Sequence, residues 1–312
     1  METTQTGVLP YPKSTNGRTL PTCPAPLKLG FRTLSRLSPS RTEQLAAWLF
    51  CHPARGKLVA DEAAVLESGH AFKLNACGHE LAAWSWGDGP TVLLHHGWNG
   101  RAAHMAGFVG PLLDAGYSVV AYDAPAHGDS PGRITAAPEM ARILREVAHR
   151  LVGLHGVVAH SLGGAATLLA IRGGLKLERA VLLASPSDLR GFIDLFGEHL
   201  GLPPRTREGM AERAASWFDI DWPQMDVSHW AEAAQPPLLV VHDRDDPVVP
   251  WDHGERIRAA WGRAELMTTE GLGHRRIRRS EDVIRKTVEF LATNPAAHRN
   301  RASRQDRRAA VR

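Results

Sequence analysis

The fold is decided by the stretch Gly156-Val-Val-Ala-His-Ser161-Leu-Gly-Gly164. A run rich in valine and small residues leads to a serine, and small residues follow that serine at once. Small neighbours let a strand and the next helix approach each other closely around a strained turn. The pattern G-x-S-x-G is typical of such an elbow, which exposes a serine hydroxyl above a parallel sheet. Here Ala159 stands at the first glycine position, and a serine that only caps a helix is the alternative interpretation.

Candidates for the other two members of a serine triad follow later strands. A serine hydroxyl needs a base to act as a nucleophile, and the base needs an orienting carboxylate. The apolar run 237–242 predicts a strand, after which come Asp243, Asp245 and Asp246. A last strand is predicted over 264–268, and His274 follows it, directly after Gly271-Leu-Gly273. Both groups therefore lie at the strand ends where open α/β sheets build their sites.

Together, four sequence blocks resemble the α/β-hydrolase superfamily over about residues 64–292. The blocks are Leu94-His-His-Gly-Trp98, Tyr122-Asp-Ala-Pro-Ala-His-Gly-Asp-Ser-Pro-Gly132, the elbow, and the paired aspartate and histidine segments. Their order and spacing are those of the family. The resemblance implies an α/β-hydrolase fold: a mainly parallel, doubly wound sheet with a small helical lid inserted after strand 6, at about residues 186–236.

The resemblance also implies roles for individual residues. Ser161 is expected to be the nucleophile, His274 the general base, and Asp246 the acid that orients it. The amides of Leu162 and Trp98 are expected to form the oxyanion hole. Counting from the family pattern G-x-x-D favours Asp246; Asp245, and Asp188 after the sixth strand, are the alternatives. The spare aspartates are expected to be solvated or to cap a helix near Trp251.

Aromatic residues concentrate in the predicted lid, which holds helix-like stretches over 189–200 and 206–218. They favour an apolar group in the substrate, although they could equally fasten the insertion to the body. The candidate pocket residues are Trp98, His160, Trp217 and Trp222. His160 is expected to project away from the nucleophile, and His96 and His127 are interpreted as structural.

The domain prediction places a poorly ordered, proline-rich extension at 1–39, the hydrolase domain at 40–296 and a basic disordered tail at 297–312. Two antiparallel strands are predicted over 64–75 and 78–86. Helical spacing is present over 40–50, 102–115, 136–152 and 255–261. We expect the first of these helices to pack on the body of the domain.

Charge is unevenly distributed along the chain. The formal net charge is +4, but residues 298–312 hold six arginines and one aspartate, so the rest is close to neutral. A solvated tail is favoured over one that binds nucleic acid or anionic lipid. An arginine among residues 275–279, directly after the proposed base, could meet an anionic substrate group, or pair with surface acids.

The sequence holds no apolar run long enough to span a membrane, and no signal-peptide core at its start. Its three cysteines are scattered, without metal-site spacing. We therefore expect a cytoplasmic protein with no cofactor and no metal, acting on a small acyl substrate. The leading hypothesis is hydrolysis of a carboxylic ester or thioester through an acyl-enzyme. An acyltransferase using the same triad, or a non-catalytic binding protein, is the alternative.

Overall fold

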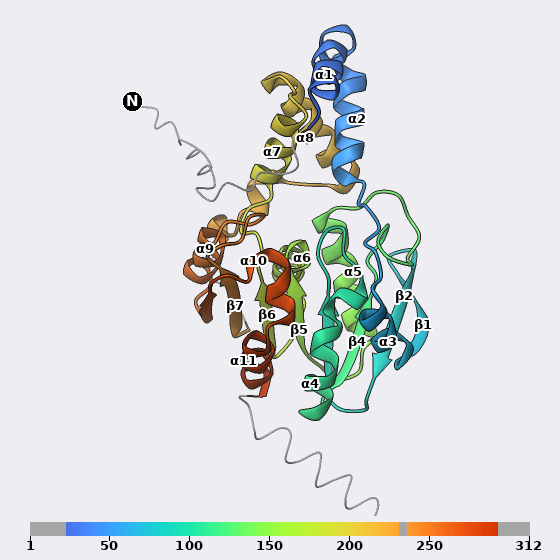
Figure 1. The fold of residues 1–312 in the computed structure, drawn as a ribbon, viewed down its shortest axis with the longest axis vertical. Coiled ribbons are helices and arrows are strands. Elements are labelled where there is room, and N and C mark those ends of the chain that lie inside the picture. The colour runs from blue at the N-terminus through green and yellow to red at the C-terminus, as the bar shows by residue number, and fades with distance from the viewer. Residues whose placement is uncertain (1–22, 231–235, 293–312) are drawn as a thin grey trace, which may run out of the picture.

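The computed structural model describes residues 23–230 and 236–292. Eight strands form one sheet in the order β1-β2-β4-β3-β5-β6-β7-β8 (Figure 1). β1 and β2 pair antiparallel, as do β2 and β4, whereas every other neighbouring pair is parallel. This confirms the predicted mainly parallel sheet. The strands are β1 (His70–Ala76), β2 (His79–Trp86), β3 (Thr91–His95), β4 (Ser118–Tyr122), β5 (Leu154–His160), β6 (Arg179–Leu183), β7 (Leu238–Asp243) and β8 (Ala264–Thr269).

Helices cover both faces of the sheet. α5 (Ala137–Arg150), α6 (Leu162–Arg172) and α9 (Asp252–Ala260) pack on one face, where they share a core with alternate strand residues. α3 (Ala60–Glu67), α4 (Val109–Asp114) and α11 (Glu281–Ala292) pack on the other. The central strands are buried on both sides, which explains their nearly continuous apolar sequences. The short segments are η1 (Ala102–Phe108), η2 (Trp222–Met225), η3 (Val227–His229), α10 (Gly273–Arg276) and η4 (Ile277–Arg279).

Four further helices form a separate layer at one end of the molecule (Figure 1). α7 (Arg190–His199) and α8 (Pro204–Phe218) lie in the insertion between β6 and β7, close to the predicted bounds. α1 (Ala25–Leu37) and α2 (Pro39–Cys51) come from the N-terminal part of the chain and pack against them. We call these four helices the cap. Their apolar faces enclose a core of their own that includes Phe31, Ala46, Ile193 and Met210.

The N-terminal predictions need correction. Residues 25–37 were expected to be poorly ordered, but they form α1, whose buried Phe31 lies in the core of the cap. α2 was expected to pack on the body, and it packs mainly on α8 instead. Residues 64–67 belong to α3 rather than to a strand, because the run Ala60–Glu67 is rich in helix formers and has acids in its first turn. Residues 1–22 and the tail 297–312 lie outside the described residues.

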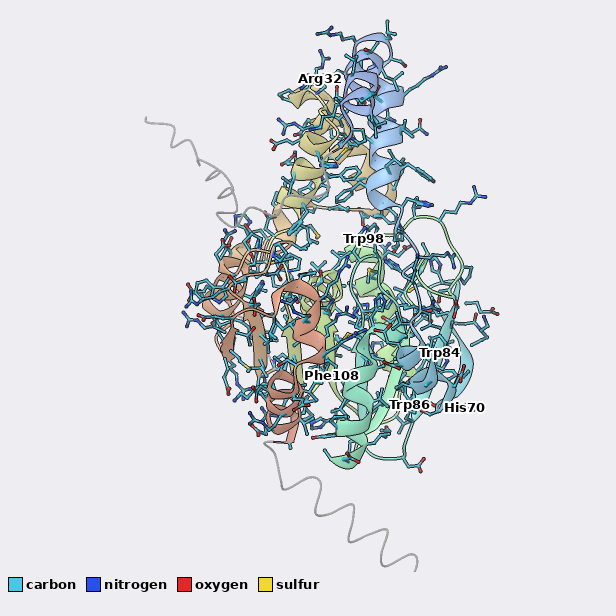
Figure 2. The ribbon with its side chains drawn as sticks, viewed as in Figure 1. Arg32, His70, Trp84, Trp86, Trp98 and Phe108 are labelled. Carbon is cyan, nitrogen blue, oxygen red and sulfur yellow. The ribbon has the colours of Figure 1, made fainter. Side chains whose placement is uncertain are left out.

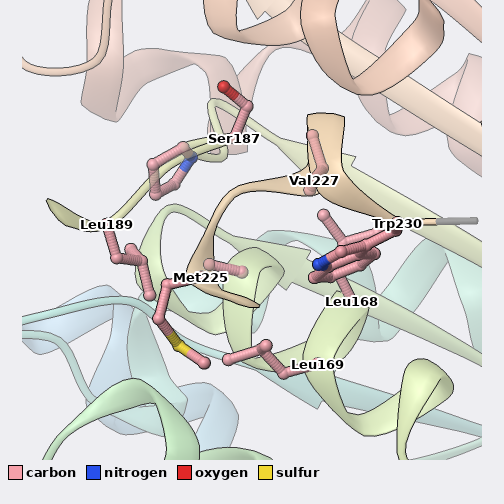
Figure 3. A pocket seen from close by; sticks show the side chains of 9 residues that line it. Leu168, Leu169, Ser187, Leu189, Met225, Val227 and Trp230 are labelled. Carbon is pink, nitrogen blue, oxygen red and sulfur yellow. The ribbon is translucent and has the colours of Figure 1, made fainter. Parts of the chain in front are cut away.

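The base of the insertion is fastened to α6. Figure 3 shows Met225, Val227 and Trp230 facing Leu168 and Leu169 of that helix. The cavity left between them has a volume of about 10 Å³. That is space for about one water molecule, so this cavity cannot hold a substrate.

Candidate active site

Ser161 lies in the sharp turn between β5 and α6. Its backbone has φ 52° and ψ −125°, a conformation that side-chain-bearing residues rarely adopt. The following glycines permit the close approach: a Cβ on Gly163 would lie 2.3 Å from the His96 carbonyl oxygen, and one on Gly164 would lie 1.7 Å from Ser185 Oγ. Ala159 is fully buried within β5, so the methyl group at the first pattern position is accommodated.

The structure brings Ser161, His274 and Asp246 together through two hydrogen bonds. The Ser161 hydroxyl lies 3.0 Å from Nε2 of His274, and Nδ1–H of His274 donates to Oδ2 of Asp246 at 2.7 Å. The Asp246 side chain is fully buried. Its other oxygen accepts the amides of Val248 and Val249 at 2.8 and 2.9 Å. The carboxylate is therefore held rigidly, and it orients the imidazole ring towards the serine.

The other candidate acids have different partners. Asp243 is buried and accepts hydrogen bonds from the Thr269 hydroxyl and the Leu272 amide. Burial raises its pKa, but the hydrogen bonds from residues 245, 269, 272 and 273 outweigh that effect and leave its pKa below the usual value. Asp245 accepts the Gly271 amide at 2.9 Å. Both thus hold the loop that carries His274. The prediction that the spare aspartates are solvated or cap a nearby helix is wrong for buried Asp243, whereas Asp245 is exposed as expected.

Asp188 instead binds the start of a cap helix. Its carboxylate accepts the amides of Arg190 and Gly191 at the start of α7, at 2.8 and 3.3 Å. Burial raises its pKa. These contacts occupy both of its oxygens, so Asp188 is bound to the cap helix, whereas Asp246 is bound to His274.

The expected oxyanion donors lie on two adjoining segments. Leu162 is the first residue of α6, where an amide has no acceptor within the helix and the helix dipole favours an anion. Trp98 follows Gly97, whose Cβ position would lie 2.8 Å from Ser161 Cβ, so the loop runs directly beside the nucleophile. The Gly97 carbonyl accepts Nδ1–H of His96 at 2.8 Å and the Gly100 amide at 3.0 Å. The loop is thus fixed in position.

His96 and His127 have the structural surroundings expected of them. Nε2 of His96 accepts the Ala124 amide at 2.9 Å, which ties the loop after β3 to the loop after β4. His127 packs edge-on against the Trp98 ring, with centroids 5.3 Å apart. Asp123 accepts the amides of Ala102 and Asp129 at 2.6 and 2.7 Å. The block around residues 122–132 therefore supports the loop that carries Trp98.

His160 has a more specific place than the sequence indicates. Its Nε2–H donates to the backbone carbonyl of His274 at 2.8 Å, and the two rings lie 4.8 Å apart. Burial, and then the nearby His274, lower its pKa well below the usual value, so the ring is neutral. His160, directly before Ser161, thus holds the loop that carries His274.

We expect His160→Leu to lower kcat about tenfold or more, with a smaller change in KM. The lost hydrogen bond allows the His274 ring to drift from Ser161, and small misplacements of catalytic groups are costly. His160→Gln keeps an N–H donor and should recover part of the rate. Initial rates on a p-nitrophenyl ester measure both variants. If the leucine and glutamine variants reduce kcat equally, the hydrogen bond from residue 160 to the His274 carbonyl does not contribute to the rate.

The remaining pocket candidates separate into two groups. Trp98 is half-buried beside the nucleophile loop, and Trp222 packs in a cluster with Leu162. Both stay candidate pocket residues. Trp217 lines a groove together with residues of α2, Arg41, Gln44, Leu45 and Trp48, so its contacts there are with the cap, and a role in the substrate pocket stays a prediction. Sequence spacing could not reveal this, because the partner helix lies far away in the chain.

Most arginines of the run after His274 have protein partners. Arg276 donates to the Gly271 carbonyl, and Arg279 forms an ion pair with Glu62. Arg278 is buried and donates to the His104 carbonyl at 2.6 Å, and burial lowers its pKa to about 10. Arg275 is exposed. A contact between Arg275 and an anionic substrate group stays a prediction.

Several histidines of the described residues are buried and have lowered pKa values, mainly because of burial. They are His95, His96, His127, His160, His242 and His253. In the unfolded chain each binds a proton near pH 6.5. Because the unfolded state then holds more protons, we expect stability to fall steeply as the pH drops below 6.5.

Two carboxyl groups of the described residues oppose this trend. Burial raises the pKa of Asp188, and it raises the pKa of Asp123 to about 6, so the folded state binds extra protons above about pH 4. The histidines outnumber them, and each contributes up to about 1.4 kcal/mol per pH unit. Urea unfolding at pH 7 and at pH 5 measures the difference. An unchanged unfolding free energy would contradict this prediction.

Comparison with known proteins identifies the family. The model of the alpha/beta hydrolase family matches residues 92–286, which is more than half of the chain. The chain belongs to the alpha/beta hydrolase family. A Variovorax paradoxus protein named as a provisional carbamate hydrolase, RutD, is 38% identical over 81 residues, which are 25% of this hydrolase chain and 30% of that protein. The chain therefore matches less than a third of the length of this relative.

Solved structures of the same fold include different hydrolases. An esterase from Pyrococcus furiosus has a TM-score of 0.58 and 20% identity, covering 78% of this alpha/beta hydrolase and 97% of the esterase. An esterase from Thermogutta terrifontis has a TM-score of 0.56 and 17% identity, covering 72% and 98%. An epoxide hydrolase from Vigna radiata has a TM-score of 0.57 and 14% identity, covering 73% and 99%. These likenesses confirm the alpha/beta hydrolase fold. Because one fold hosts many reactions, the reaction has to be inferred from the site residues.

Within residues 23–230 and 236–292 of this hydrolase, no group of three or more His, Cys, Asp or Glu side chains is arranged to hold a metal ion. No helix there has the length and apolar character that crossing a bilayer requires.

Proposed function

We propose that this alpha/beta hydrolase cleaves a carboxylic ester or thioester through an acyl-enzyme on Ser161. The observation that carries the proposal is the continuous chain of hydrogen bonds from Ser161 Oγ through His274 to buried Asp246. That order of donors and acceptors is what a serine nucleophile needs. The esterase structures and the carbamate hydrolase relative support acyl chemistry in general.

In the proposed reaction, Ser161 Oγ attacks the acyl carbon while His274 Nε2 takes the hydroxyl proton. The carbonyl oxygen gains negative charge, which the amides of Leu162 and Trp98 stabilise. Asp246 keeps Nδ1 of His274 protonated and stabilises the imidazolium that forms. His274 returns its proton to the leaving alcohol or thiol. A water molecule, deprotonated by His274, then releases the acid and restores Ser161.

The first test maps the reactive residue and measures turnover. A fluorophosphonate probe should label the wild-type protein stoichiometrically, and peptide mass spectrometry should place the adduct on Ser161. p-Nitrophenyl esters from acetyl to lauroyl should be turned over, with an optimum that measures the acyl pocket. Labelling of a residue other than Ser161, or no labelling together with no turnover, would contradict the proposal.

A competition experiment separates hydrolysis from acyl transfer. With water and a primary alcohol both present, a hydrolase should release mainly free acid at all moderate alcohol concentrations. If the ester of the added alcohol dominates the products, the protein is an acyltransferase with the same triad. The product ratio is measured by chromatography.

A further inference from the structure

The outward face of α1 combines cations with exposed leucines. The helix carries Lys28, Arg32 and Arg36 and has no acidic residue. Leu29 is 66% exposed and Leu37 is 79% exposed. Residues 29, 32, 33, 36 and 37 recur at helical spacing, so they share one face of the helix. α1 lies in the part of the cap farthest from α11, and Arg32 is labelled there in Figure 2.

Neither the two arginines of this face nor Lys28 beside it is neutralised by an acid of the described residues. Within the described residues, Lys28, Arg32 and Arg36 form no ion pair. Arg32 donates only to the Gly201 carbonyl, at 3.4 Å. The insertion helices differ, because three of their four arginines pair with acids: Arg190 with Asp194 and Glu208, Arg207 with Glu198, and Arg213 with Glu43. Most of the unpaired positive charge on the described part of the cap therefore belongs to α1.

The beginning of α2 also carries exposed cationic and apolar side chains. Arg41 is exposed and lies in a groove of about 300 Å³ between α2 and α8. The groove is otherwise lined by Gln44, Leu45, Trp48 and Trp217. Leu45 is 41% exposed and Trp217 is 36% exposed. Exposed leucine, tryptophan and arginine side chains thus occur together on the cap.

We propose that the outward face of α1, together with Arg41 at the adjoining start of α2, binds the surface of an anionic lipid bilayer. Arginine and lysine bind lipid phosphates, while leucine and tryptophan enter the boundary between headgroups and acyl chains. A nucleic acid would match the cations but would leave the leucines in water. A bilayer surface satisfies both, and the helices lie on it without crossing it. This proposal does not depend on the chemistry at Ser161.

The test is co-sedimentation of the full-length protein with phosphatidylcholine vesicles, with and without phosphatidylglycerol. We expect binding to the anionic vesicles that weakens with added salt. Arg32→Glu with Arg36→Glu should reduce the partition coefficient more than tenfold, since each basic residue near the surface contributes about fivefold or more. Leu29→Ser with Leu37→Ser should also reduce it. Circular dichroism and thermal unfolding establish that the variants fold.

Matched control variants carry the same kinds of substitution on the body of the protein instead of on the cap. Arg258→Glu with Arg263→Glu gives the same change in charge, and Leu58→Ser with Val152→Ser removes exposed apolar side chains. Both controls should bind vesicles as the wild type does. The arginine-rich tail is present in every variant, so binding through the tail would leave the cap variants unchanged.

Three results would overturn the proposal. They are equal binding of wild type and the arginine variant, equal binding to vesicles without anionic lipid, and a dimer in solution that the leucine variant dissociates. The last result would make this face an interface between two copies of the chain.

Discussion

Ser161→Ala is expected to lower kcat for ester hydrolysis on the order of 10⁴- to 10⁶-fold. Alanine removes the only atom that can form the acyl-enzyme, while the remaining donors at Leu162 and Trp98 still polarise a bound ester. KM should change little, because the hydroxyl contributes more to the reaction than to ground-state binding. Initial rates on a p-nitrophenyl ester measure the loss, and fluorophosphonate labelling should disappear with it.

The matched control for this change is Ser216→Ala. Ser216 is exposed on α8, and its hydroxyl donates only to the Arg213 carbonyl of its own helix. This variant should retain wild-type kcat and probe labelling. If Ser161→Ala keeps even a few per cent of the wild-type rate after purification from contaminating esterases, another nucleophile does the chemistry.

Asp246→Asn is expected to lower kcat on the order of 10⁴-fold, through the protonation state of His274. Oδ1 of Asp246 accepts the amides of Val248 and Val249, so the oxygen of an asparagine will occupy that position. Its NH₂ group must then face Nδ1 of His274. That arrangement puts the imidazole proton on Nε2, where it can no longer accept the proton of Ser161.

Asp245→Asn is the control for the loss of a neighbouring charge. Its carboxylate accepts the Gly271 amide and lies on the same loop, but it does not bond to the His274 ring. We expect a loss of less than about tenfold, because an amide oxygen can still accept that hydrogen bond. Comparable losses in the two variants would mean that Asp246 has no special role in orienting the base.

The sequence predicts the sheet and the central residues of the site because both depend on local patterns. The elbow needs a serine and small residues within a few positions of each other, and Gly163 and Gly164 lie against backbone and side-chain atoms that leave no space for a Cβ. The partners of Asp243 and Asp245 could not be predicted in this way. They depend on where residues 269–274 lie in space, and spacing within the acidic loop does not contain that information.

The packing of the cap likewise could not be predicted from local sequence patterns. The helical pattern of residues 189–218 predicts α7 and α8, but it does not reveal which helices cover their apolar faces. Those partners are α1 and α2, and the Arg32–Gly201 and Arg213–Ser40 hydrogen bonds join residues 169 and 173 positions apart. An amphipathic pattern shows that a face is buried without showing what buries it.

The long stretch of chain between α2 and α8 affects the order in which the cap folds during synthesis. The α1–α2 hairpin leaves the ribosome about 170 residues before α8 does, so at 5–20 residues per second it waits on the order of 10–30 s for its partner. During that time Phe31, Ala46 and Ala47 have none of the α8 residues that cover them in the finished protein. The cap can be completed only after β6 and α8 have emerged, and until then the nascent hairpin exposes apolar residues that a chaperone could cover.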